Sequence, residues 1–313
     1  MKQNILITGC AGFIGSHAVD DFLNKGYRVT GVDCFTYAAK ESNISHNYDN
    51  KNFNMHTTDI CDTEEIFKIC NENSINSIIN FAAETHVDNS IDSCDAFINS
   101  NITGVKSLLD VCRRTGIFLL HVSTDEVYGS TLDGSFDEKS KLNPQNPYSA
   151  TKAAAEHLVR SYSNTYGVKY NMVRPSNNFG PRQHSEKFIP TILRSIGENK
   201  KIPIYGNGEN IRDWLYVKEN VRAIRYIFEN ATRNETFNIT AKTEMKNIDL
   251  VKKILEKREL SFSDCVSFVE DRKGHDFRYS ITNDKLTNLG FKFNNDMFEE
   301  YLVETIRSRE EDF

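Results

Sequence analysis

Short apolar runs alternate with stretches of helical periodicity through the first 175 residues of the chain. Between the apolar runs, hydrophobic positions recur at three- and four-residue spacing, which predicts helices over 13–25, about 63–73, about 94–115 and about 148–166. The apolar runs themselves predict strands at 4–8, 27–33, 53–59, 77–83, 118–123 and 169–175. Strands of this kind alternating with helices are typical of a parallel sheet covered on both faces. The pattern therefore predicts an α/β fold with a doubly wound parallel sheet.

The pattern loosens after Pro175, where prolines and glycines punctuate shorter elements. We expect a smaller C-terminal lobe built from about 176–213 and 241–313. Residues of about 214–240 are expected to add one helix and one strand to the main domain, whose other part is residues 1–175.

Composition argues against several classes of protein but does not identify the function. The 313 residues carry a net charge of -6, which gives no electrostatic footprint for nucleic acid. No apolar run approaches the ~20 residues of a membrane helix, and the N-terminus lacks a secretion pattern, so we expect a cytoplasmic protein. Seven dispersed cysteines without a C-x-x-C pair indicate reduced thiols. Eight histidines without close spacing predict no metal site.

A glycine-rich loop follows the first strand and opens the first helix. Its spacing is G-x-x-G-x-x-G, in which Gly9 would make the turn, Gly12 would admit a pyrophosphate and Gly15 would let the helix pack closely. Asp33 ends the second strand 18 residues after Gly15, near the position of the acid that binds a ribose 2′-hydroxyl. No arginine follows Asp33 to bind a 2′-phosphate, which favours NAD over NADP. The loop therefore predicts a dinucleotide site on a Rossmann-like sheet.

Polar side chains also follow later strands. Asp59 and Ile60 come after the third strand, where they would meet the adenine, and the small Ala82 and Ala83 after the fourth would let the cofactor lie against the backbone. The segment 121–129, His-Val-Ser-Thr-Asp-Glu-Val-Tyr-Gly, places two acids at the mouth of the fifth strand, where open α/β sheets bind their ligands.

A tyrosine and a lysine stand four residues apart at the start of a predicted helix. Tyr148 and Lys152 therefore share one face, and the ammonium group would stabilise the phenolate of a tyrosine whose ordinary pKa is ~10. Such a tyrosine can act as a base near neutrality. The Y-x-x-x-K spacing alone also occurs as a surface pair, but its place after a dinucleotide loop makes it specific.

The glycine loop together with Thr124, Tyr148 and Lys152 resembles the extended short-chain dehydrogenase/reductase family. The segments at 123–129, 146–159 and 274–279 narrow the likeness to nucleoside-diphosphoglucose 4,6-dehydratases of the dTDP-glucose and UDP-glucose types, over nearly the whole chain. The triplet Thr-Asp-Glu at 124–126 is its most specific part.

The resemblance implies a three-step reaction that gives an NDP-4-keto-6-deoxy-glucose, a step toward deoxysugars such as rhamnose. Tyr148 would take the C4 hydroxyl proton while NAD accepts the C4 hydride. Thr124 would hydrogen-bond the C4 oxygen, and Lys152 would lie beside the tyrosine. Glu126 would then remove the C5 proton as Asp125 protonates the departing C6 hydroxyl. The stored hydride would finally reach C6. Close carboxylates push their pKa values apart, which lets one acid be protonated and the other ionised.

The resemblance also implies two binding sets and a homodimer paired through the helices at about 94–115 and 148–166. Arginine and lysine suit the phosphates of the nucleotide sugar. The base, dTDP or UDP, stays open. The NAD set comprises Gly9, Gly12, Phe13, Ile14, Gly15, Asp33, Thr36, Asp59, Ile60, Ala82, Ala83, Ser100, Tyr148, Lys152 and Asn178. The substrate set comprises Thr85, Thr124, Asn177, Asn178, Lys187, Tyr205, Arg212, Asn247, Arg272 and His275.

Two alternatives stay open on the sequence. An NAD-dependent sugar-nucleotide 4-epimerase would use Thr124, Tyr148 and Lys152 but would leave Asp125 and Glu126 without a role. A non-catalytic NAD-sensing protein of the same fold typically loses the tyrosine or the lysine, and this chain keeps both. A 4-keto-6-deoxy product would separate the dehydratase from both.

Overall fold

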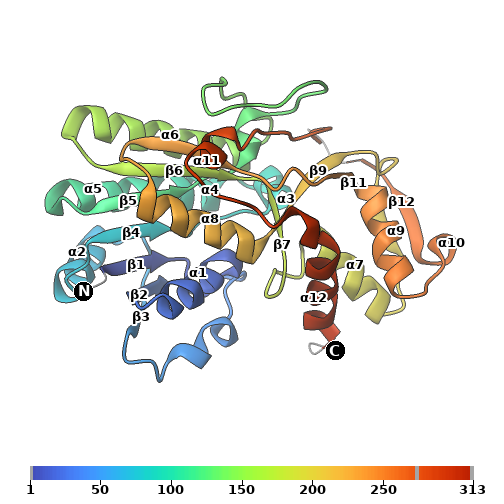
Figure 1. Cartoon of the computed structure of the whole chain (residues 1–313), viewed down its shortest axis with the longest axis horizontal. Helices are drawn as coiled ribbons and strands as arrows, with labels where there is room; N and C mark the ends of the chain where they lie inside the picture. Colours follow the sequence, from blue (N-terminus) through green and yellow to red (C-terminus); the bar gives the residue numbers. More distant parts are fainter. Residues whose placement is uncertain (1–2, 272–274, 311–313) are drawn as a thin grey trace.

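The computed structural model describes residues 3–271 and 275–310. Its largest element is a seven-stranded sheet in the order β10–β6–β5–β4–β1–β2–β3, in which every neighbouring pair is parallel (Figure 1). The predicted α/β fold with a doubly wound parallel sheet is confirmed. The strands are β1 (Asn4–Thr8), β2 (Arg28–Asp33), β3 (Phe53–Thr57), β4 (Ser77–Asn80), β5 (Phe118–Val122), β6 (Tyr170–Pro175) and β10 (Glu235–Ile239).

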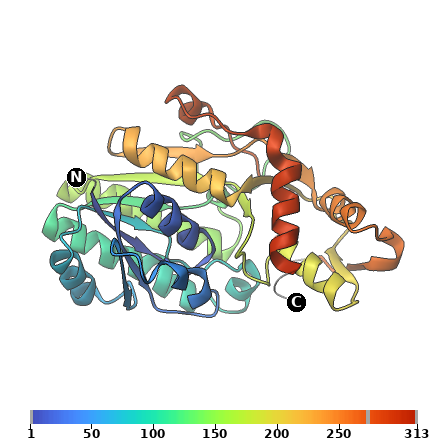
Figure 2. The ribbon, with the colours of Figure 1, turned by 60° about the horizontal axis from the view of Figure 1, so that its bottom comes forward.

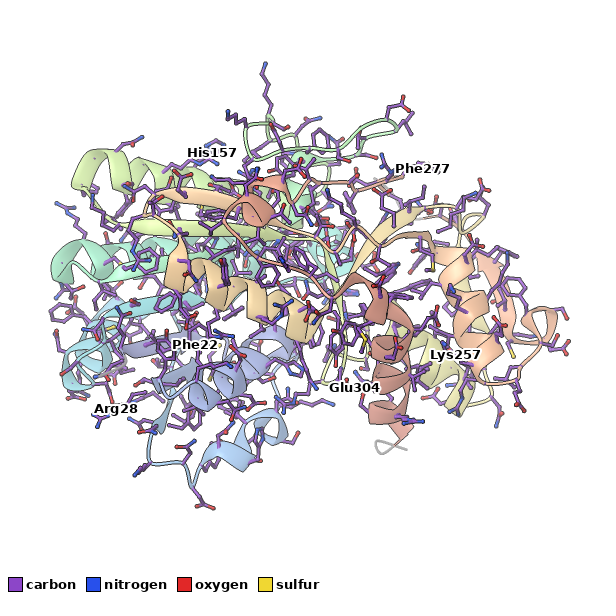
Figure 3. All side chains as sticks on the ribbon, viewed as in Figure 1. Phe22, Arg28, His157, Lys257, Phe277 and Glu304 are labelled. Carbon is purple, nitrogen blue, oxygen red and sulfur yellow. The ribbon has the colours of Figure 1, made fainter. Side chains whose placement is uncertain are left out.

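Helices cover both faces of this sheet because its strands are apolar on both sides (Figure 2). On β1, Ile5 and Ile7 pack with α1 (Phe13–Asn24) and α8 (Val217–Asn230), while Leu6 packs toward the opposite face. Phe22, labelled in Figure 3, sets its ring 5.6 Å from that of Phe228 and joins α1 to α8. The opposite face is covered by α2 (Thr63–Glu72), α5 (Val105–Thr115) and α6 (Pro147–Tyr166).

The C-terminal part adds a smaller region of mixed sheet. Strand β9 pairs in parallel with β7 and antiparallel with β11, and β8 pairs with β12. As expected, α8 and β10 return to the main sheet; the division into two domains stays a prediction. The elements are β7 (Asn177–Phe179), α7 (Phe188–Gly197), β8 (Ile202–Tyr205), β9 (Ile211–Tyr216), β11 (Glu244–Lys246), α9 (Asn247–Lys257), α10 (Phe262–Cys265), β12 (Val266–Val269), α11 (Asp284–Asn288) and α12 (Phe298–Glu310).

Some predicted boundaries were wrong. The strand expected over 77–83 ends at Asn80, after which the backbone of Phe81 and Ala82 packs against Gly9 of the glycine loop. The strand expected over 53–59 ends at Thr57. The helix expected over 94–115 has three parts, which are α4 (Asp95–Phe97), a π-helical segment η3 (Ile98–Gly104) and α5. Shorter elements are η1 (Glu41–Asn43), η2 (Ser45–Asn47), α3 (Val87–Asp92), η4 (Asp125–Tyr128) and η5 (Asn295–Met297).

The described part of the chain contains neither a membrane-spanning helix nor a cluster of potential metal ligands. Neither 3–271 nor 275–310 contains a helix that is long and apolar enough to cross a membrane. Over the same residues, no cluster of three or more histidine, cysteine, aspartate or glutamate side chains could hold a metal ion.

Candidate active site

A cavity of about 420 Å³ lies at the carboxyl ends of β1, β2, β4, β5 and β6. The sheet order places β1 between β4 and β2, which is the switch point where open α/β sheets bind their ligands. The cavity is lined by every residue of the predicted NAD set and by all five predicted catalytic residues, which are Thr124, Asp125, Glu126, Tyr148 and Lys152. Residues far apart in the sequence are thus brought to one hollow.

The glycine loop at one side of the cavity has no room for a side chain at Gly9 or Gly15. Gly9 adopts φ +65°, and a Cβ there would lie 2.7 Å from the Ala82 nitrogen. A Cβ on Gly15 would lie 2.0 Å from the Gly9 carbonyl oxygen. Helix α1 begins directly after Gly12 with no acid in its first turn and no side-chain cap, so its N-terminus suits an anion.

Asp33 stands beside this loop at the end of β2. Its Oδ2 accepts the Ala11 N–H and its Oδ1 accepts the Phe35 N–H, both at 2.9 Å. Each carboxylate oxygen can accept more than one hydrogen bond, so capacity remains for ribose hydroxyls. The loop, the helix terminus and Asp33 therefore fit the pyrophosphate and ribose of a dinucleotide.

Tyr148 lies in the first turn of α6, whose start is fixed by a capping box. Asn146 accepts the Ser149 N–H at 2.9 Å, and Pro147 occupies the first helical position. Lys152 is buried, and its Nζ donates to the Val122 carbonyl at 2.7 Å. The lysine therefore anchors α6 to the end of β5.

Burial shifts the pKa values of both members of this pair. Burial and then Glu126 raise the pKa of Tyr148 above its ordinary range, against a hydrogen bond with Thr124 that lowers it. Burial lowers the pKa of Lys152 to about 8. Burial is the largest cause of the rise in the Tyr148 pKa, and Lys152 is not among its causes; the easing of Tyr148 ionisation by Lys152 stays a prediction.

The two acids open the 3₁₀ turn η4, which follows β5 after Ser123 and Thr124. Thr124 caps this turn by accepting the Glu126 N–H at 3.3 Å, and its hydroxyl donates to Asp125 Oδ1 at 3.2 Å. Among the described residues, the buried Asp125 Oδ2 has no hydrogen-bond partner. The cap thus presents both acids to the cavity.

The surroundings of the two acids affect their pKa values differently. Burial, then Glu126 and Asp213, raise the pKa of Asp125 well above its ordinary value. Burial also raises the pKa of Glu126, but the cations Arg212 and Lys187 oppose that rise. Burial and like charges thus favour the protonated form of Asp125, whereas the two cations favour the ionised form of Glu126.

The predicted substrate residues fall into two groups. Thr85, Thr124, Asn177, Asn178 and Lys187 line the cavity. Tyr205, Arg212, Asn247 and His275 lie beyond its lining, and Arg272 falls outside the described residues.

The second group surrounds the turn between β8 and β9. The rings of Tyr205 and His275 are 6.3 Å apart, and the Asn247 N–H donates to the Asn210 carbonyl at 2.9 Å. Arg212 is buried and donates to the backbone carbonyls of Ile211, Asp276 and Phe277. Arg212 thus holds the segment 276–277 in place, and its role toward the substrate stays a prediction.

The sequence reasoning missed several residues. Glu84, His184 and Glu186 line the cavity beside the predicted Thr85 and Lys187. Asn101 comes from the π-helical segment, accepts the Glu84 N–H at 2.9 Å and donates to Thr151 Oγ1 at 3.0 Å. Glu84 and Glu186 could have been found as neighbours of predicted residues, whereas helical periodicity carried no signal for Asn101.

Comparison with known proteins agrees with this geometry. A family model described as GDP-mannose 4,6 dehydratase matches residues 6–305. The low-salt glycan biosynthesis protein Agl12 of Haloferax volcanii is 41% identical, over 93% of this chain and 93% of its own. The dTDP-glucose 4,6-dehydratase of Streptomyces niveus is 39% identical, over 97% and 92%. The crystal structure of DesIV, a dTDP-glucose 4,6-dehydratase of Streptomyces venezuelae solved with NAD bound, superposes with a TM-score of 0.94 at 34% identity, covering 99% and 97%.

Proposed function

The chain belongs to the GDP-mannose 4,6 dehydratase family and resembles the dTDP-glucose 4,6-dehydratases within it, and we propose that it converts dTDP-glucose to dTDP-4-keto-6-deoxy-glucose. The predicted class, an NAD-dependent nucleotide-sugar dehydratase of the extended short-chain dehydrogenase/reductase family, is confirmed. The assignment of individual residues to steps is our proposal.

One observation supports the dehydratase function above others. The cavity holds the neighbouring acids Asp125 and Glu126, whose pKa values are both raised by burial but are separated by the cations near Glu126. Loss of water across C5 and C6 needs a base for the C5 proton and an acid for the C6 hydroxyl. Glu126 is our base and Asp125 is our acid. A 4-epimerase needs neither group.

Two residues beside the acids serve the oxidation of C4, which precedes the loss of water. Thr124 and Tyr148 both line the cavity, and we assign them to the C4 oxygen. Oxidation of C4 makes the C5 proton acidic enough for a carboxylate to remove. Lys152 holds the start of α6 against β5 and so keeps Tyr148 beside Thr124.

The NAD is assigned to the glycine loop, the N-terminus of α1 and Asp33, with Asp59, Ile60, Ala82 and Ala83 at its sides. When bound, it supplies the acceptor for the C4 hydride and the donor for C6. We assign the second group of predicted substrate residues, around Tyr205, Asn247 and His275, to the nucleotide.

The test is conversion by the purified protein supplied with NAD. The expected product of dTDP-glucose is one water lighter by mass spectrometry and shows a C6 methyl group by NMR. An isomer of unchanged mass would support the epimerase. A parallel incubation with UDP-glucose decides the base, for which we expect slower conversion.

The homodimer and the cytoplasmic location stay predictions. We expect α5 and α6 to form the subunit interface, and sedimentation of the purified protein at twice the monomer mass would support it. A monomer at micromolar concentration would contradict it.

A further inference from the structure

Glu126 has a neighbour that the proposed reaction does not yet use. Tyr279 places its Oη 3.4 Å from Glu126 Oε2 and 2.6 Å from Asp276 Oδ2. Tyr279 and Asp276 are both buried. The three side chains thus form a row of oxygens that leads away from the base.

The backbone that carries this row is held independently of the tyrosine hydroxyl. The Ile211 N–H donates to the Phe277 carbonyl at 2.8 Å, and Arg212 Nη2 donates to the Asp276 carbonyl at 3.0 Å. The Arg212 guanidinium also lies 4.5 Å from the centre of the Tyr279 ring. A phenylalanine at position 279 would therefore keep the ring in place.

The number of protons in the row depends on the state of Glu126. The Tyr279 hydroxyl has one proton, and the short distance to Asp276 indicates that it is donated there. Tyr279 Oη then faces Glu126 with lone pairs only. That contact is weak while Glu126 is a carboxylate, but Glu126 becomes a donor once it is protonated.

We propose, on the basis of the dehydratase function, that Tyr279 is a positioning residue for Glu126, held by Asp276 to accept a hydrogen bond from the newly protonated carboxyl. The C5–H bond breaks and an O–H bond forms on Glu126, while the electron pair forms the C5–C6 double bond. The C6–O bond breaks, and the proton of Asp125 leaves with the hydroxyl as water. Glu126 later returns its proton to C5 when C6 accepts the hydride taken from C4. The proton that Tyr148 took from the C4 hydroxyl restores Asp125, so Tyr279 and Asp276 are unchanged overall.

Other groups also act on Glu126 and bear on its titration. Arg212 and Lys187 favour its ionised form, as does the 3.4 Å hydrogen bond from Asn146, and Asp276 disfavours it. Its neighbours Asp125 and Tyr148 titrate in the same cavity. A pH profile alone would therefore mix several groups, and the decisive readout is an isotope effect on the C5–H bond.

The experiment compares dTDP-glucose carrying hydrogen or deuterium at C5, with wild type and Tyr279→Phe. We expect Tyr279→Phe to lower kcat about 2- to 10-fold, the range for one hydrogen bond between neutral groups. KM should change little, and the isotope effect on kcat should rise above the wild-type value because C5–H cleavage has become slower. Asp276→Asn should act in the same direction more weakly. Tyr226→Phe is the matched control, since its hydroxyl donates to the Leu289 carbonyl at 3.1 Å outside the cavity.

The possible results distinguish failure of the role of Tyr279 from failure of the dehydratase function. An active wild type with an unchanged kcat or an unchanged isotope effect in Tyr279→Phe overturns the role of Tyr279. A fall in kcat without a rise in the isotope effect indicates a structural role only and overturns it as well. A wild type that converts neither dTDP-glucose nor UDP-glucose contradicts the proposed function itself.

Discussion

Replacing Glu126 by glutamine tests the chemistry of the acid pair with little change of shape. The amide keeps the size of the side chain and can still meet Asn146 and Tyr279, whose polar atoms lie 3.4 Å from Glu126 Oε2. It cannot accept the C5 proton. We expect kcat to fall about 100- to 10,000-fold, the usual worth of a general base, which corresponds to about 2.7–5.5 kcal/mol in the barrier.

The assay is product formation from dTDP-glucose at saturating NAD, with Glu65→Gln on the surface of α2 as the control. KM should stay within a few-fold of wild type, because the lost interaction belongs to the transition state. In wild type, kcat/KM should fall toward acid as Glu126 is protonated and toward alkali as Asp125 loses its proton; burial raises both pKa values, which shifts both limbs upward in pH. Release of water by Glu126→Gln at the wild-type rate would refute the assignment.

Three further changes test the surrounding structure. Gly15→Ala should abolish measurable NAD binding by calorimetry, because its Cβ would lie 2.0 Å from the Gly9 carbonyl oxygen; binding of wild-type strength would contradict the loop assignment. Asp125→Asn should stabilise the fold by about 1–3 kcal/mol at pH 8 but hardly at pH 4. The reason is that the raised pKa of Asp125 costs wild type no stability below the pKa of an unfolded aspartate, and costs it stability as the pH rises above that value. Equal unfolding curves of the two proteins at pH 8 would count against the raised pKa. Glu156→Gln should lower the free energy of unfolding, measured by chemical denaturation, by about 3–5 kcal/mol. The change leaves the buried Arg174 guanidinium without a counter-charge, whereas in wild type its Nε lies 2.8 Å from Glu156 Oε1. A loss below about 1 kcal/mol would argue against the Glu156–Arg174 ion pair.

Local sequence patterns were sufficient for the main sheet and for the residues at its carboxyl edge. Apolar runs separated by helical periodicity dictate parallel strands, and parallel strands bring their ends together. Gly9, Asp33 and Thr124 could therefore be assigned to one site, because each lies at the end of a strand or within two residues of it.

Contacts between distant segments left no such local signal. Tyr279 meets Glu126 across 153 residues, through a segment that is paired to β9 rather than to the main sheet. The burial of Arg212 against the backbone carbonyls of Asp276 and Phe277 depends on that same pairing, and its role as a phosphate ligand stays a prediction. The π-helical segment kept apolar spacing close enough to an α-helix to be read as one.

The most direct test of the central claim follows one hydrogen atom. Purified protein with NAD is given dTDP-glucose deuterated at C4, and the product is examined by NMR. Our account predicts that the deuterium leaves C4 and appears on the C6 methyl of a product that has lost water. Deuterium that stays at C4, or returns there in an isomer of unchanged mass, would contradict it.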